Sequence, residues 1–218
     1  MFERDQTMSK QQSDAWFAER CGKVTASRIA DVVATTKSGG WGATRANYMA
    51  ELVSERLTGV PYPSFTSAAM QWGTDMEAEA IEAYQFYCGQ IVEPVGFVVH
   101  PHIEMSGASP DGLVAADGLV EVKCPNTATH ITSLLGGPIE SKYILQMQWQ
   151  MACTGRAWCD FCSFDPRMPE EMRLLVTRVN RDDKRIELLA GREVVQFLDE
   201  LDERVKFLIE RYGREKAA

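Results

Sequence analysis

The sequence predicts an α/β fold formed by a single domain over residues 1–218. Three observations predict this class. Apolar residues at helical spacing dominate the N-terminal part, strand-like alternation dominates the middle, and a long amphipathic helix closes the chain. With 218 residues and 45% hydrophobic content, the chain is long enough to bury a core within one domain.

Helices dominate the N-terminal part and are expected over residues 13–20, 25–33, 43–57 and 67–88. Ser13 and Thr25 are residue types that cap helix N-termini, and Gly59 with Pro61 ends the third helix. Gly73 is a point at which the fourth helix can break.

The middle of the chain alternates like a sheet, with strands expected over residues 91–100, 113–114, 119–124, 157–164 and 173–179. A flexible basic loop, a turn and a polar loop are expected over residues 37–40, 61–64 and 105–110. Two further helices are expected, from residue 126 or 127 to 135 and over 142–153. The final helix, 182–212, has a core face formed by Ile186, Leu189, Phe197, Leu201, Val205 and Leu208.

One motif points to chemistry: Ser-Pro-Asp-Gly at 109–112, followed nine residues later by Glu-Val-Lys at 121–123. Two carboxylates, Asp111 and Glu121, suit Mg²⁺, which binds oxygen and bridges to substrate phosphates. On a strand Glu121 and Lys123 project to one face, so Lys123 can orient or deprotonate the attacking water and offset charge on the phosphate. This predicts phosphodiester hydrolysis; the alternative is an exposed hairpin with a solvated Glu–Lys pair.

A third acid, Glu77, is out of place on its helix. It aligns with Ile81, Tyr84 and Cys88 on an otherwise apolar stripe. A carboxylate there is costly unless it is paired or bound to metal, so Glu77 could complete a two-metal clamp. The alternative is a rim glutamate whose charged end reaches solvent.

Two groups of donors could bind phosphate. Gln146 and Gln150 share a helix face, where ordinary polarity at the core edge is the alternative. Arg20 lies with Thr25 and Ser27 near a helix start and suits a terminal phosphate, although Arg20 is equally explained as a helix-end cap.

The cysteines favour no metal centre. On a strand Cys159 and Cys162 point to opposite faces and cannot chelate together, so neither zinc nor an iron–sulfur cluster is expected. No histidine has a recognisable catalytic partner either, which argues against Ser–His and Cys–His chemistry.

Net charge is −8, which by itself argues against a nucleic-acid partner. The excess is local, however. Residues 61–120 hold eight acids and no Lys or Arg, and the remaining 158 residues hold 23 acids and 23 bases. Bound cations near Asp111 would cancel part of the local charge, so acidity does not exclude a DNA enzyme.

The polar start is not a signal peptide and no apolar run is long enough to span a membrane, which predicts a cytoplasmic protein with reduced thiols.

Six motifs occur in an order that resembles phage lambda exonuclease and the related YqaJ-type viral recombinase nucleases: WFAERCGKVTAS (16–27), WGTDME (72–77), SPDG (109–112), EVKCP (121–125), LQMQ (145–148) and FDPRM (164–168). The resemblance implies a restriction-endonuclease-like PD-(D/E)xK core. It also implies Mg²⁺-dependent 5′→3′ digestion of one strand of duplex DNA to mononucleotides, leaving a 3′ overhang, with Mn²⁺ as a substitute ion.

The resemblance also assigns roles to individual residues. Asp111, Glu121 and the Val122 carbonyl would bind metal, Lys123 would assist the nucleophilic water, and Glu77 falls on a further acidic position. The positions that engage the 5′-phosphate are matched by Arg20, Ser27, Ser109 and Gln146. Met70 matches an apolar wedge at the terminal base pairs. Lys37 matches a basic side chain that enters DNA, where it replaces an arginine and loses the planar fork.

Family members form ring-shaped homotrimers, work with a single-strand annealing recombinase and act in the bacterial host cytoplasm, so the resemblance implies these too. Three other functions stay open: an endonuclease or nickase on the same core, a DNA-end-binding scaffold without activity, and a small-molecule hydrolase using the same metal pair.

Overall fold

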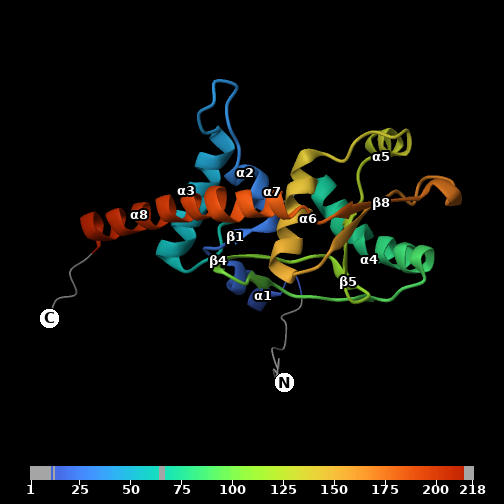
Figure 1. Ribbon diagram of the computed structural model, residues 1–218, viewed down its shortest axis with the longest axis horizontal. Helices are drawn as coiled ribbons and strands as arrows, with labels where there is room; N and C mark the ends of the chain where they lie inside the picture. The colour runs from blue at the N-terminus through green and yellow to red at the C-terminus, as the bar shows by residue number, and fades with distance from the viewer. Residues whose placement is uncertain (1–10, 12, 64–66, 214–218) are drawn as a thin grey trace, which may run out of the picture.

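The computed structural model describes residue 11 and residues 13–63 and 67–213 (Figure 1). The helices of these residues are α1 (Asp14–Arg20), α2 (Ile29–Val32), α3 (Ala43–Thr58), α4 (Ala68–Cys88), α5 (Thr127–Leu134), α6 (Ser141–Thr154), α7 (Asp183–Leu188) and α8 (Val195–Tyr212). The strands are β1 (Val24–Thr25), β2 (Val92–Glu93), β3 (Val98–His100), β4 (Ile103–Ala108), β5 (Gly112–Val114), β6 (Gly118–Lys123), β7 (Trp158–Phe164) and β8 (Leu174–Asn180). Two 3-10 helices, η1 (Ala26–Arg28) and η2 (Glu170–Met172), and a π-helix, η3 (Leu189–Val194), complete the described elements.

Helix ends follow the capping residues of the sequence. The Ser13 side chain accepts a hydrogen bond from the Trp16 backbone N–H, as expected of an N-cap. Asn126 caps α5 in the same way. Gly59 ends α3 in the left-handed conformation with φ of 69°, which suits glycine because it has no Cβ. The predicted turn over 61–64 ends at a residue that lies outside the described residues.

The described strands form two sheets, one with the order β1-β4-β3 and one with the order β2-β5-β6-β7-β8. In the larger sheet β6 pairs parallel with β7, and its other neighbours pair antiparallel. The larger sheet is therefore mixed, as predicted. Helices cover both of its faces, since α4 packs against one face and α6 against the other.

Two predictions were wrong around the smaller sheet, one of a strand and one of a loop. The single strand expected over 91–100 is two strands in different sheets, because Pro94 lies between β2 and β3 and has no N–H to donate. The polar loop expected over 105–110 is largely strand β4. The Ser106 hydroxyl is buried there and donates to the Val24 carbonyl. A Cβ on Gly107 would lie 2.4 Å from the Phe97 ring, so glycine permits this close packing.

Three helix predictions were also wrong in detail. The α4 helix continues through Gly73, where a Cβ would meet nothing within 4 Å. Residues 25–33 divide into the end of β1, η1 and α2. The helix expected over 182–212 is interrupted by the π-helix η3 between α7 and α8.

The largest core cluster joins α2, α3, α6 and the C-terminal helices with the smaller sheet. Its members include Ile29, Met49, Trp149, Leu189, Phe197 and Leu201, all wholly buried. Helix α8 runs beside α3 and extends to one side of the molecule (Figure 1). Helices α2 and α3 thus share one core with the C-terminal helices, while α4 and α6 hold the larger sheet between them.

Candidate active site

The hairpin of β5 and β6 places the predicted acid motif. Gly112 pairs with Val120, which leaves Asp111 one step beyond the pair and beside Glu121. The Val122 backbone N–H donates to Asp111 Oδ2 at 2.6 Å. A Cβ on residue 112 would lie 2.1 Å from the Val92 side chain, so glycine allows the turn to approach β2. The hairpin therefore fixes the Asp111 carboxylate against the next strand.

Glu121 is wholly buried and has donors on both carboxylate oxygens. Its Oε1 accepts from Lys123 Nζ and, at 2.6 Å, from Gln146 Nε2. Its Oε2 accepts from Gln150 Nε2 at 2.6 Å. The prediction that Glu121 and Lys123 share a face of the strand is confirmed by their ion pair.

Burial and neighbouring charges shift the pKa values of Asp111, Glu77 and Lys123. Burial, and then the charge of Glu121, raises the pKa of Asp111 well above its usual value. Burial also raises the pKa of Glu77, with opposing contributions from Lys123 and Glu121. Burial alone would lower the pKa of Lys123, but Glu121 and Asp111 outweigh it and raise that pKa. Lys123 is therefore an ammonium group here, and the paired acids would be stabilised by a bound dication.

A cavity of about 700 Å³ opens beside these groups. Its wall includes Glu77, Asp111, Val122, Lys123 and Met70. The donor chemistry fits Mg²⁺, since carboxylate and carbonyl oxygens are its usual protein ligands. Asp111, Glu121 and the Val122 carbonyl are the residues that would hold it.

Glu77 reaches the cavity from the opposite side of the larger sheet. Glu121 bonds to α6, whereas Glu77 belongs to α4 on the other face. The Tyr84 hydroxyl anchors α4 to the sheet by donating to Asp160 at 2.8 Å. Within the part of the chain that the structure describes, no three His, Cys, Asp or Glu side chains converge closely enough to hold an ion. The three-acid clamp that includes Glu77 stays a prediction.

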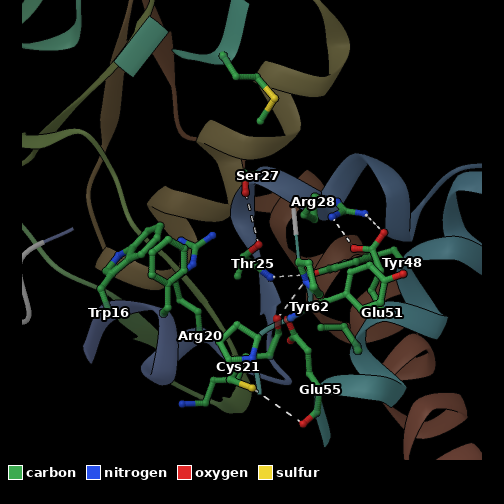
Figure 2. A pocket seen from close by; sticks show the side chains of 16 residues that line it. Trp16, Arg20, Cys21, Thr25, Ser27, Arg28, Tyr48, Glu51, Glu55 and Tyr62 are labelled. Carbon is green, nitrogen blue, oxygen red and sulfur yellow. Dashed lines mark hydrogen bonds and ion pairs between the residues drawn. The ribbon is translucent and has the colours of Figure 1, made fainter. Parts of the chain in front are cut away.

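A second cavity, of about 680 Å³, lies between α1, β1 and α3 (Figure 2). Arg20 stacks on the Trp16 ring at 3.9 Å and donates to Ser109 Oγ at 3.1 Å. Burial lowers the pKa of Arg20 to about 10, with Tyr48 and Glu55 opposing the shift. None of the ion pairs among the described residues includes Arg20. A largely buried guanidinium without a carboxylate partner favours an anion as its ligand.

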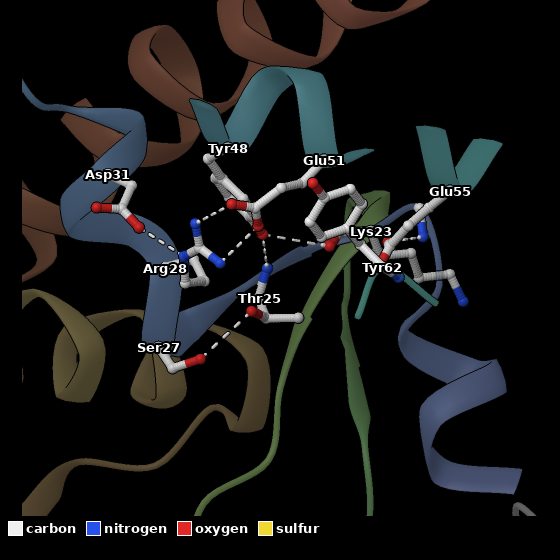
Figure 3. Close-up of polar contacts among 10 residues, drawn as sticks. Lys23, Thr25, Ser27, Arg28, Asp31, Tyr48, Glu51, Glu55 and Tyr62 are labelled. Atoms are coloured by element: carbon white, nitrogen blue, oxygen red, sulfur yellow. Dashed lines mark hydrogen bonds and ion pairs between the residues drawn. The ribbon is translucent and has the colours of Figure 1, made fainter. Parts of the chain in front are cut away.

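The acids of this second cavity already have partners (Figure 3). Arg28 forms a two-pronged ion pair with Glu51, at 2.8 and 3.3 Å, and also pairs with Asp31. Glu55 accepts from the backbone N–H groups of Gly22 and Tyr62. Of the two arginines that line this cavity, Arg20 is therefore the one better suited to bind an incoming anion.

The structure gathers the predicted site residues into two groups and leaves one apart. The second cavity is lined by Arg20, Ser27 and Met70, and Ser109 accepts a hydrogen bond from Arg20. Gln146, predicted at the 5′-phosphate, instead donates to Glu121. Met70 is 56% exposed and lines both cavities. Lys37 lies exposed in the loop before α3 and lines neither cavity.

Sequence reasoning missed two residues of the first cavity. Tyr143 places its ring centroid 5.3 Å from Lys123 Nζ, and its spacing from Gln146 on one helix face was the available signal. Arg167 stacks on Trp72 at 4.7 Å and bonds to Asp165, and it lies within the FDPRM motif. The placement of Cys159 and Cys162 on opposite faces of the sheet is confirmed.

Comparisons with known proteins show the family and the fold. The YqaJ-like viral recombinase domain matches residues 15–157 of the chain. The chain belongs to this family. A crystal structure of an alkaline exonuclease from Laribacter hongkongensis is 50% identical, with a TM-score of 0.84, and covers 91% of this chain and 97% of that one. The same exonuclease in complex with dAMP matches equally well.

A phage-related exonuclease from Haemophilus somnus 129PT is 16% identical, with a TM-score of 0.65 over 85% of this chain and 96% of that one, and shows the fold alone. The predicted restriction-endonuclease-like α/β fold is confirmed. No curated protein matches the chain significantly. Among the helices of the described residues, none combines the length and apolarity needed to cross a membrane.

Proposed function

We propose that this YqaJ-like protein is a Mg²⁺-dependent exonuclease acting on linear double-stranded DNA. It would remove mononucleotides from one strand in the 5′→3′ direction and leave a 3′ overhang for recombination by strand annealing. One observation carries the proposal: Met70 borders both the cavity of Arg20 and the cavity of Asp111. A strand held by its terminal phosphate in one cavity can therefore present a phosphodiester bond in the other.

The relatives support this activity and its substrate class. The Laribacter hongkongensis relative, at 50% identity, is an alkaline exonuclease, and it has been crystallised with dAMP. A deoxynucleoside monophosphate is the product expected when a DNA strand is shortened one nucleotide at a time.

The residues of the first cavity have distinct tasks in hydrolysis. Asp111 and Glu121, with the Val122 carbonyl, would hold Mg²⁺, which would supply positive charge to the phosphate and help orient a water. Lys123 stays protonated between the acids, so its ammonium group donates to the water or to a phosphate oxygen. The Val122 N–H fixes the orientation of Asp111.

The second cavity would determine the polarity of digestion. Arg20, Ser109 and Ser27 offer a guanidinium and two hydroxyls to a terminal 5′-phosphate. Met70, at the boundary of the two cavities, would press against the terminal base pairs, and Lys37 would contact DNA from its exposed loop. The ring-shaped homotrimer, the annealing partner and substitution by Mn²⁺ stay predictions.

Product analysis on end-labelled linear duplex tests the proposal, with EDTA as the control for metal dependence. The expected product is mononucleotides from the 5′-ended strand, with none in EDTA. A covalently closed circle should stay intact, because an exonuclease needs an end. Cleavage of the circle would indicate an endonuclease, and full activity of Asp111→Ala would remove Asp111 from the mechanism.

A further inference from the structure

The two oxygens of Glu121 have different surroundings. Oε1 accepts from Lys123 and Gln146, and Lys123 lines the first cavity with its side chain 29% exposed. Oε2 accepts from Gln150, which is wholly buried and does not line that cavity. Both oxygens are buried, but Oε1 contacts a residue that lines the cavity and Oε2 contacts one that does not.

Gln150 is itself held in place. It lies on α6 between Trp149 and Met151, and all three side chains are wholly buried. The amide oxygen of Gln150 lies 4.0 Å from the Cys159 thiol, and its Nε2 donates to Glu121 at 2.6 Å. Burial and the contacts with Cys159 and Glu121 restrict the rotamer, so the amide acts as a fixed donor.

A fixed donor on Oε2 has a consequence for metal binding. A carboxylate free to rotate can offer either oxygen or both, whereas one anchored at Oε2 presents Oε1 in a constant direction. Groups that hydrogen-bond a ligating carboxylate in this way orient it for the ion. An amide does this without adding charge beside Asp111 and Glu121.

We propose that Gln150 is a positioning residue for the metal site: it anchors Oε2 of Glu121 and directs Oε1 toward the ion and Lys123. This inference rests on the proposed function, because it assumes that Asp111 and Glu121 bind a divalent cation. Gln150 touches neither substrate nor ion in this arrangement and acts only through Glu121.

Gln148 provides a matched control on the same helix. It is 3% exposed, and its amide donates to the Asn180 carbonyl and accepts from the Asp182 N–H, both at 2.8 Å. Gln150→Met and Gln148→Met thus remove the same group from the same buried helix, but only the first removes a partner of Glu121.

The experiment measures Mn²⁺ binding to the DNA-free protein by electron paramagnetic resonance or calorimetry. Gln150→Met should weaken Mn²⁺ binding by roughly 10- to 100-fold, and Gln148→Met should leave it unchanged. Exonuclease activity of Gln150→Met should recover in part as Mn²⁺ is raised, while binding to DNA ends in EDTA should match the wild type. If Gln150→Met folds poorly, Gln150→Leu removes the same amide with another apolar side chain and should weaken Mn²⁺ binding by a similar factor.

The outcomes separate this inference from the proposed function. Asp111→Asn should weaken Mn²⁺ binding in any case. Suppose that it does, and that the Mn²⁺ affinity of Gln150→Met stays within about twofold of the wild type, which is less than the loss expected for a residue that orients a metal ligand. The role of Gln150 is then refuted, and the metal site stands. Equal losses in Gln148→Met and Gln150→Met would attribute the effect to α6 as a whole and also refute it. If the wild type binds no Mn²⁺, both proposals fail.

Discussion

Replacing Arg20 is the sharpest perturbation of the proposed digestion polarity. Its guanidinium lines the second cavity, takes part in none of the ion pairs of the described residues, stacks on Trp16 and donates to Ser109. A hydrogen bond to a charged group contributes about 1.5–3 kcal/mol. At 1.36 kcal/mol per tenfold change, Arg20→Ala should lower kcat/KM on 5′-phosphorylated duplex by roughly 10- to 150-fold.

The assay compares two linear duplexes that differ only in a 5′-phosphate or a 5′-hydroxyl. The wild type should prefer the phosphate, and Arg20→Ala should remove that preference while changing the rate on 5′-hydroxyl ends little. Taking the ratio of the two rates within each variant cancels general losses of activity. Arg20→Lys should restore only part of the preference, because it keeps the charge and loses the planar fork.

A matched control removes one positive and one negative charge from the second cavity, so the net charge of the cavity does not change. Arg28 and Glu51 neutralise each other, so the double variant Arg28→Gln with Glu51→Gln should keep the phosphate preference. The reasoning is refuted if the wild type degrades both ends equally, or if Arg20→Ala keeps the wild-type ratio.

Four further predictions concern pH and the DNA end. The pKa of Asp111 is raised, so between its usual and its raised pKa the folded metal-free protein binds more protons than the unfolded chain. Its stability should therefore fall as pH rises through that interval. In thermal melts of Asp111→Asn the fall should become smaller, and the part that remains comes from Glu77, whose pKa is also raised. Protons compete with the ion, so calorimetry should show Mn²⁺ binding tightening toward alkaline pH; an affinity independent of pH would contradict the raised pKa. The pKa of Asp165 is lowered to about 2, mainly by Arg167, so Asp165→Asn should cost about 1–2 kcal/mol in chemical unfolding at neutral pH, and that cost should shrink as pH falls toward 2. Met70→Ala should slow digestion several-fold on blunt ends but little on frayed ends, and equal slowing would exclude a wedge.

Local sequence was enough to predict the elements that carry the motif. Asp117-Gly118 predicted the hairpin, and the two-residue period of a strand predicted that Glu121 and Lys123 share a face. Both are observed, because these features depend only on neighbours in the chain. Ser13 and Gly59 likewise predicted helix ends correctly, since capping is a local interaction.

Features that depend on distant partners were missed. Ser106 and Gly107 look like loop residues, yet they form a strand because Val24 and Phe97 pack against them from other parts of the chain. Gly73 looks like a helix break, yet α4 continues through it. Packing against the larger sheet outweighs the weak helix propensity of one glycine.

The sequence by itself determined the α/β class, the Asp111, Glu121 and Lys123 group, and the family, since motif order and strand period are properties of the linear chain. Only the tertiary structure decided which groups face one another. It placed the amides of Gln146 and Gln150 as donors to the two carboxylate oxygens of Glu121. It also placed Glu77, from the opposite face of the sheet, in the wall of the first cavity. The physical reason is that these contacts join α4, α6 and β6, whose relative placement is fixed by burial of their shared core.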